Sequence, residues 1–222
     1  MGGRGTGVAE QSGRTAKAEA ERAPAGQADL VIDVLWLATL QAIGGRAAHE
    51  VRGALNAVSV NLEVARSRSE KIGVSASTLT PFATTAAAQL ENVIAMTEAL
   101  MALVRSARGP IDLGADVGRV AGLVAPSARA LGRSIELDHS IGGLGTTSAS
   151  SSSARLAIGH CLLAAVDAST DVRCVAGPGE RCLRVEHRAA GVGVDGDVVA
   201  ALSAAGIRVE TEASAIVITF PR

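Results

Sequence analysis

The sequence predicts an α+β protein in which a long helical hairpin, forming a dimeric four-helix bundle, is followed by a reduced α/β sandwich. Two observations lead to this prediction. Apolar residues recur every three or four positions within residues 29–109, as in helices that pack on other helices. Beyond Gly109-Pro110 the pattern changes to short helical stretches between short strand-like runs. We therefore divide the chain into residues 1–28, 29–109 and 110–222.

The first 28 residues carry almost no large apolar side chain. They cannot bury enough surface to offset the entropy lost on ordering, so we expect residues 1–28 to be a disordered tail. The whole chain is 48% hydrophobic with a net charge of -1, which favours a globular protein and gives no reason to expect a nucleic-acid partner. We see no signal peptide and no apolar run long enough for a membrane span. With an odd number of cysteines as well, we expect a cytoplasmic protein without membrane partners.

One long helix is expected from about Asp29 to Ser69, with a weak point at Gly44-Gly45 where two helix-disfavouring residues adjoin. A short connection containing Gly73 leads to a second helix that has Pro81 in its first turn and continues to about Ala107. The apolar seam of the first helix consists of Val34, Leu37, Gln41, Gly44, Ala48, Val51, Leu55, Val58, Leu62 and Ala65. The seam of the second consists of Leu90, Ile94, Thr97, Met101 and Val104. Two helices offer too little core to stand alone, so a homodimer completes the bundle.

One histidine stands beside the seam of the first helix. His49 shares a stripe with Arg52, Gly53 and Asn56, because residues three, four and seven apart lie on one helical face. Its imidazole should therefore face water or a partner. Glu50 follows directly, and a carboxylate near an imidazole can accept the Nδ1 proton and leave Nε2 as the nucleophile. From spacing alone, an ordinary surface histidine on a bundle helix remains the more frequent explanation of such a residue.

A resemblance to a known family favours a functional role for His49 over an ordinary surface histidine. The run His49-Glu50-Val51-Arg52-Gly53-Ala54-Leu55-Asn56 resembles the H box of bacterial two-component histidine kinases, H-E-[LIV]-R-x-P-L, in which the histidine accepts a phosphoryl group. Ala54 replaces the usual proline, so the helix should run straighter past the site. Gly53 stands where the family often has Thr or Asn to position water, which argues against phosphatase activity. The resemblance implies catalytic roles for His49 and Glu50, and partner docking at Arg52, Gly53 and Asn56.

The second half is predicted to alternate between helices and strands, with a Gly, Ser and Thr-rich loop over Gly142–Ser153. Helices are expected near Ala115–Leu131, Ser153–Asp167 and Gly196–Ala205, and strands near Ser134–Asp138, Asp171–Val175, Arg181–His187, Ile207–Glu212 and Ala215–Phe220. The order and spacing of these elements resemble those of the ATP-binding domain of the same kinases, in a smaller form.

The motifs that bind ATP in that family are lost here. The run matching its N box, N-L-L-x-N-A, is His160-Cys161-Leu162-Leu163-Ala164-Ala165, without either asparagine. The run matching D-x-G-x-G begins at Ala189 and keeps the glycines Gly191 and Gly193 but not the aspartate. Only a few residues separate Gly193 from the next helix, so the lid that covers the triphosphate has no room. Asp195 and Asp197 are expected to cap that helix. We therefore expect no nucleotide cofactor and no metal bound by this chain.

Taken together, these features resemble the dimeric bacterial histidine phosphotransferases, which relay a phosphoryl group between receiver-domain aspartates through a histidine without using ATP. The resemblance implies response regulator receiver domains as partners, with the receiver of a hybrid kinase as a further candidate, and Mg²⁺ bound on the partner receiver. Two alternatives stay open. One is a pseudokinase scaffold that binds a response regulator or kinase without carrying phosphate, and the other is a sensor histidine kinase with an aberrant nucleotide site.

Overall fold

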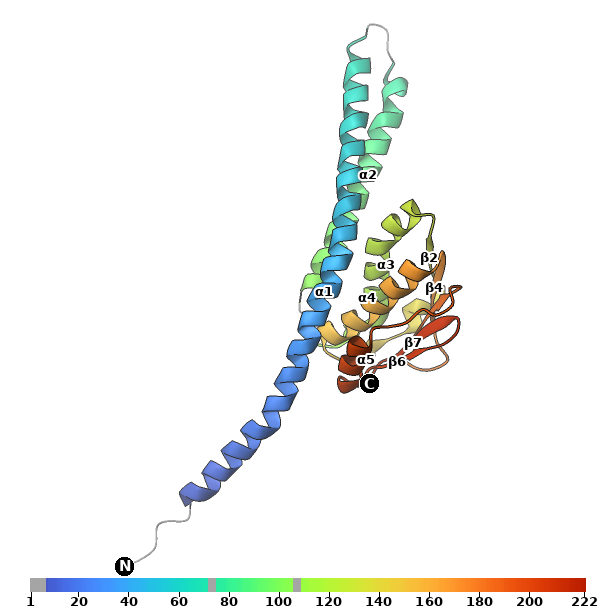
Figure 1. Ribbon diagram of the computed structural model, residues 1–222. Coiled ribbons are helices and arrows are strands. Elements are labelled where there is room, and N and C mark those ends of the chain that lie inside the picture. The colour runs from blue at the N-terminus through green and yellow to red at the C-terminus, as the bar shows by residue number, and fades with distance from the viewer. Residues whose placement is uncertain (1–6, 72–74, 106–108) are drawn as a thin grey trace, which may run out of the picture.

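The computed structural model describes residues 7–71, 75–105 and 109–222, with side chains from Gly26 onward. Helix α1 (Gly7–Ser69) and helix α2 (Ala76–Val104) form the antiparallel hairpin, and α1 extends far beyond the end of α2 (Figure 1). The predicted end of the first helix at Ser69 is confirmed. Pro81 lies inside α2 rather than in its first turn, because the helix already begins at Ala76.

The prediction of a disordered tail over residues 1–28 differs from the structure, which continues α1 back to Gly7. The reason is that Ala, Glu, Gln, Lys and Arg dominate this segment, and these residues have high helix propensity without needing burial. Residues 1–6 of the predicted tail lie outside the described residues. Helix α1 also runs without interruption through Gly44 and Gly45, although Figure 1 shows that it curves along its length.

The remainder of the chain forms the α/β domain. Its helices are α3 (Leu113–Ala130), η1 (a 3-10 helix, His139–Gly143), α4 (Ser151–Ala168) and α5 (Gly196–Ala204). Its strands are β1 (Ile111–Asp112), β2 (Ser134–Leu137), β3 (Thr146–Thr147), β4 (Asp171–Ala176), β5 (Cys182–His187), β6 (Arg208–Thr211) and β7 (Ala215–Thr219). Every predicted strand and helix of this half is present within a few residues. The expected loop instead contains part of η1 and the short strand β3.

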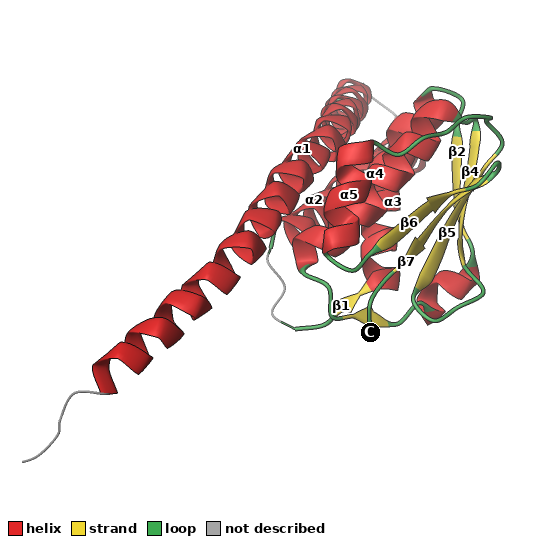
Figure 2. Cartoon of the chain, turned by 60° about the horizontal axis from the view of Figure 1, so that its bottom comes forward, coloured by secondary structure: helices red, strands yellow, loops and turns green. Residues whose placement is uncertain are grey.

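The main sheet has the strand order β2-β4-β5-β7-β6. Strands β2 and β4 are parallel, with Ile135 opposite Val172, and the other neighbours pair antiparallel. Helices α3, α4 and α5 lie on one side of this sheet, between it and the hairpin (Figure 2). The predicted two-layer arrangement of helices on one face of a mixed sheet is confirmed.

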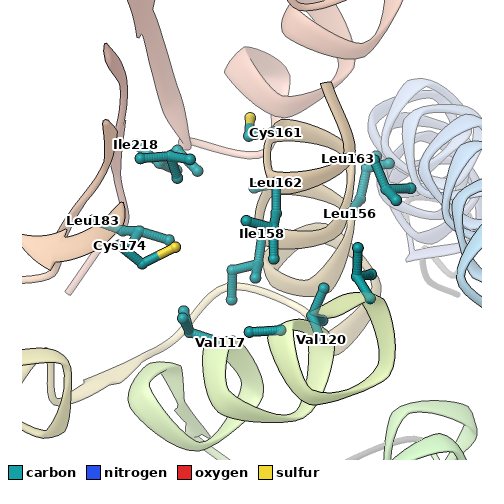
Figure 3. Close-up of a cluster of buried hydrophobic side chains, with 14 of the residues drawn as sticks. Val117, Val120, Leu156, Ile158, Cys161, Leu162, Leu163, Cys174, Leu183 and Ile218 are labelled. Carbon is teal, nitrogen blue, oxygen red and sulfur yellow. The ribbon is translucent and has the colours of Figure 1, made fainter. Parts of the chain in front are cut away.

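Helix α4 is the centre of the core. Its sequence is apolar on nearly every side, as expected for a helix enclosed by other elements. In Figure 3, Ile158 and Leu162 face the sheet residues Leu183 and Ile218, while Val117 and Val120 of α3 approach from another side. Leu163 points instead toward α1. A helix buried on all these sides fixes the positions of the sheet, α3 and α1 at once.

Helices α1 and α4 pack closely at Gly159. A Cβ atom built there would lie 3.0 Å from Thr39 Cγ2, 3.2 Å from Ile43 Cδ1 and 3.5 Å from Trp36 Cζ3. The absent side chain is therefore what allows these three residues, each less than 9% exposed, to reach the surface of α4. This contact attaches the α/β domain directly to the long helix of the hairpin.

A buried arginine attaches the same domain to the end of α2. Arg155 of α4 donates from Nη1 to the carbonyl oxygens of Leu103, at 2.9 Å, and Arg105, at 2.7 Å. Its Nε donates to Asp116 Oδ2 at 2.9 Å, and Arg119 donates to the other oxygen of the same carboxylate at 2.5 Å. Carbonyl groups at a helix C-terminus lack intrahelical donors, so Arg155 supplies partners that α2 requires.

Apart from Val58, the predicted seams are not the faces that meet within one chain. On α1, Val58 is buried together with Ile32, Trp36, Ile43, Ala47 and Ala54, and this buried face is centred about 90° from the middle of the predicted seam at about 100° per residue. Of the predicted seam residues, Val34, Leu37, Leu55, Leu62, Leu90, Ile94, Met101 and Val104 are 42% or more exposed. Each helix thus has two apolar faces, and we call this exposed set the outer apolar face.

Over Gly26–Ser69 and Ala76–Val104, the two helices of the hairpin are long and apolar enough, by length and composition alone, to cross a membrane. The expectation that no segment meets this test is therefore wrong. The observation is weak evidence for a span, since core helices of soluble proteins meet the same test. Two features of the Gly26–Ser69 stretch argue against a span. It contains the charged residues Asp29 and Asp33, and its apolar residues Trp36 and Ile43 are covered by the α/β domain.

We predict that Gly159→Leu lowers the free energy of unfolding by about 1 to 3 kcal/mol, the usual cost of overpacking a close contact. Gly122→Leu on α3 is the matched control, because nothing lies within 4 Å of a Cβ at that position. Chemical denaturation of both variants measures the difference. Equal stability of the two would show that α1 and α4 do not meet as closely as described.

Candidate functional site

The candidate site residues lie together on one continuous stretch of α1. His49, Arg52, Gly53 and Asn56 are exposed, as the stripe predicted, and Glu50 is half-buried. Because the helix is unbroken here, His49 is held by backbone hydrogen bonds on both sides rather than by a loop. The helix is continuous at Ala54, and the straighter passage expected from the missing proline stays a prediction.

Glu50 does not share the face of His49. Consecutive helical residues point about 100° apart, so the carboxylate is directed toward the side of α1 that packs on the rest of the chain. Among the described residues, no hydrogen bond or ion pair joins His49 to Glu50. The role that the sequence suggests for Glu50, accepting a proton from the imidazole, therefore stays a prediction.

His49 stands between two different surfaces around the circumference of α1. At about 100° per residue, Leu55 and Leu62 of the outer apolar face lie about 120° to 140° to one side. On the other side, about 60° away, Arg46 faces the α/β domain. The histidine is thus flanked on one side by a surface that no described part of the chain covers, and on the other by the junction between the hairpin and the α/β domain.

That junction contains a charged cluster. Arg46 Nη2 donates to both carboxylate oxygens of Asp167, at the end of α4, at 2.7 and 2.8 Å. Arg133, in the turn between α3 and β2, has its Nη1 3.7 Å from Asp167 Oδ1 and donates to the carbonyl oxygen of Val166 at 2.6 Å. Two guanidinium groups therefore share one carboxylate one helical turn from His49. Sequence reasoning missed this cluster, since 121 positions separate Arg46 from Asp167 and no local pattern connects them.

Residues of the run that resembles the N box in position also lie against α1. His160 and Ala164 of α4 line a cavity of about 350 Å³ together with Ala38, Thr39 and Ala42 of α1. Burial lowers the pKa of His160, and the nearby Asp195 carboxylate opposes this shift. The position of the N box thus faces a protein helix, in a cavity lined mainly by small side chains.

The loop after β5 is as short as the sequence indicated. Gly191 has a φ of +72°, a left-handed conformation that glycine adopts without strain. Helix α5 begins at Gly196, and Asp195 Oδ1 accepts a hydrogen bond from the backbone nitrogen of Asp197 at 2.8 Å. Asp195 is therefore the N-cap of α5, as predicted, while Asp197 lies in its first turn.

No protein-family model matches the chain, and no curated protein matches it significantly. Among solved structures, the Acinetobacter baumannii histidine kinase AdeS is similar to the chain at 14% sequence identity and a TM-score of 0.37, over 78% of this chain and 97% of that chain. A likeness at this TM-score carries no functional argument. The proposals below therefore depend on the residues and contacts of the chain itself.

We predict that His160 titrates below the ordinary histidine pKa of 6.5, because burial against α1 disfavours the charged imidazolium. NMR titration of the imidazole resonances measures this directly. Because the folded pKa is depressed, folding should be penalised as pH falls below about 6.5, where the unfolded chain takes up the proton. A His160→Ala variant should lose that part of the pH dependence, and a His160 midpoint above 6.5 would contradict the described burial.

Proposed function

We propose that the protein is a dimeric histidine phosphotransferase that passes a phosphoryl group between receiver-domain aspartates through His49, without using ATP. The observation that carries this proposal is the position of His49, exposed on an unbroken helix beside an α/β domain whose nucleotide-binding residues have been replaced. An exposed imidazole on a rigid helix is suited to in-line attack on a phosphoryl group presented by another protein.

The proposed transfer begins with neutral His49. The Nε2 lone pair attacks phosphorus of the receiver's aspartyl phosphate; as the N–P bond forms, the P–O bond breaks and its electron pair leaves with the aspartate carboxylate. The proton on Nδ1 is then released to water. Transfer to a second receiver reverses these steps, and Mg²⁺ held by the receiver neutralises the charge on the moving group.

The attachment of the α/β domain supports a phosphotransferase over a kinase. A kinase domain has to carry its nucleotide to the histidine. Here the close contact at Gly159, the hydrogen bonds of Arg155 to the end of α2 and the Arg46–Asp167 pair attach the domain to both helices of the hairpin. The loss of both N-box asparagines and of the adenine-binding aspartate removes polar partners worth a few kcal/mol each. We infer that this domain serves as a wall against which a receiver docks beside His49.

A homodimer accounts for the outer apolar face. Eight large or medium apolar side chains of α1 and α2 stay 42% or more exposed in the single chain, more than a monomeric hairpin is expected to show. A second copy would cover them in a four-helix bundle. A lipid surround is disfavoured, because Asp29 and Asp33 lie in the apolar stretch of α1 and charged side chains are costly to place in a membrane. On this ground we propose a cytoplasmic protein.

The second candidate function is a scaffold that binds a receiver or kinase without carrying phosphate. The half-buried Glu50, without a described contact to His49, is the observation that favours it. The two functions share the same docking surface at Arg52, Gly53 and Asn56, so binding alone cannot separate them.

We predict that label from a ³²P-phosphorylated receiver reaches the wild-type protein in the presence of Mg²⁺, and that His49→Ala reduces this transfer to background. His139→Ala is the matched control, since this side chain is 97% exposed on the other domain and should not affect transfer. Labelled ATP alone should leave no label on any variant. If none of the receivers of the source genome transfers label to the wild-type protein, while at least one of them binds it, the scaffold function is favoured.

We predict that Leu62→Glu combined with Ile94→Glu raises the dimer dissociation constant by more than about 100-fold, because buried carboxylates without partners cost several kcal/mol. Val60→Glu is the control, since Val60 is 62% exposed and lies away from the outer apolar face. Sedimentation equilibrium measures all three proteins. If the double variant remains as dimeric as the control, this face does not form the dimer.

A further inference from the structure

Arg46 lies one helical turn before His49, on the side that faces the α/β domain. Residues three apart in a helix have Cβ atoms about 5 to 6 Å from each other. Helical side chains also lean toward the N-terminus, so the imidazole of His49 lies over the turn that carries Arg46. An arginine is long enough to reach a phosphoryl group on the Nε2 atom of such a neighbour.

At present Arg46 is bound elsewhere. It makes its two hydrogen bonds to Asp167 while only 25% exposed, and this pair is a direct polar link between α1 and the end of α4. Asp167 is 55% exposed, so solvent weakens the link. If Arg46 moved away, Asp167 would keep the guanidinium of Arg133 at 3.7 Å, and Arg133 is itself held by the carbonyl of Val166. The exchange therefore leaves no carboxylate without a counter-ion.

We propose that phosphorylation of His49 draws Arg46 from Asp167 to the phosphoryl group and thereby loosens the α/β domain from α1. The inference rests on the proposed function, since it concerns the same histidine. A phosphoryl group carries up to two negative charges and three acceptor oxygens, so it competes for a guanidinium more strongly than one half-exposed carboxylate. Arg52, one turn after His49, is also within reach, but Arg52 has no described contact with the α/β domain and transmits nothing to it.

This exchange couples two equilibria. Because Asp167 and the phosphoryl group compete for one arginine, the contact that holds the domain and the phosphorylated state oppose each other. Loss of Asp167 should favour phosphorylation, and loss of Arg46 should disfavour it, although both variants break the same ion pair. A merely structural ion pair would give the same sign for both.

Trp36 reports the position of the domain. It is the single tryptophan of a chain without tyrosine, it is 8% exposed, and it lies against α4 at Gly159. Loosening of α4 from α1 should expose its indole to a soluble quencher. Acrylamide quenching of the full-length protein therefore measures the contact without an added probe.

The experiment has two arms. In the first, ammonium phosphoramidate phosphorylates the protein chemically, and Trp36 quenching is followed. We expect phosphorylation to increase quenching in wild type and in Arg66→Gln, a control whose exposed pair with Glu63 lies on the same helix. Arg46→Gln and Asp167→Asn should show increased quenching already without phosphate, and no further response. Unchanged quenching of phosphorylated wild type would overturn the inference.

In the second arm, a phosphorylated receiver domain sets the equilibrium between its aspartate and His49. We expect Arg46→Gln to lower the equilibrium ratio of phosphorylated to unphosphorylated protein by about tenfold, the effect of one lost charge-assisted hydrogen bond. Asp167→Asn should raise the same ratio. Shifts of the same sign, or none, would overturn the inference. If no receiver transfers phosphate at all, the proposed function fails, while the quenching arm still decides the role of Arg46.

Discussion

The packing of α1 on α4 at Gly159 is the contact on which the arrangement of this molecule depends. With no side chain at that position, Trp36, Thr39 and Ile43 reach the surface of α4, and the long helix becomes part of the core of the α/β domain. The hairpin and the domain are therefore one packed unit. Because α4 also packs on the sheet and on α3, this contact, together with the Arg155 hydrogen bonds to α2, sets where the domain lies relative to His49.

The faces of α1 around His49 are occupied in different ways, and this difference bears on function. One face of α1 packs on the α/β domain and on α2, and the outer apolar face has no partner among the described residues. The histidine lies between them, above the Arg46–Asp167 junction. A domain packed in this way can shape a docking surface beside His49. Its residues His160 and Ala164, at the position of the N box, face α1. Under the proposed function, the same contact would build the docking platform for a receiver and would work against delivery of a nucleotide to His49.

Much of this fold follows from local patterns in the sequence. Period-3.6 and period-2 runs gave the helices and strands of the sheet domain, and Ser69 marked the helix end. The two-residue strands β1 and β3 were missed, because so short a pairing has no periodicity to detect. The second apolar face of each helix, the Gly159 contact and the Arg46–Asp167 pair depend on residues far apart in sequence. His49 was found through a motif, whereas its neighbours required the structure.

The most direct test of the central claim is to locate the phosphoryl group after incubation with a phosphorylated receiver. Tandem mass spectrometry at neutral pH, on peptides cleaved after arginine, isolates residues 47–52, in which His49 is the single histidine. The account predicts one added phosphoryl group on this peptide, dependent on the receiver and absent with ATP alone. Phosphate on another histidine, or on His49 from ATP without a receiver, would contradict it.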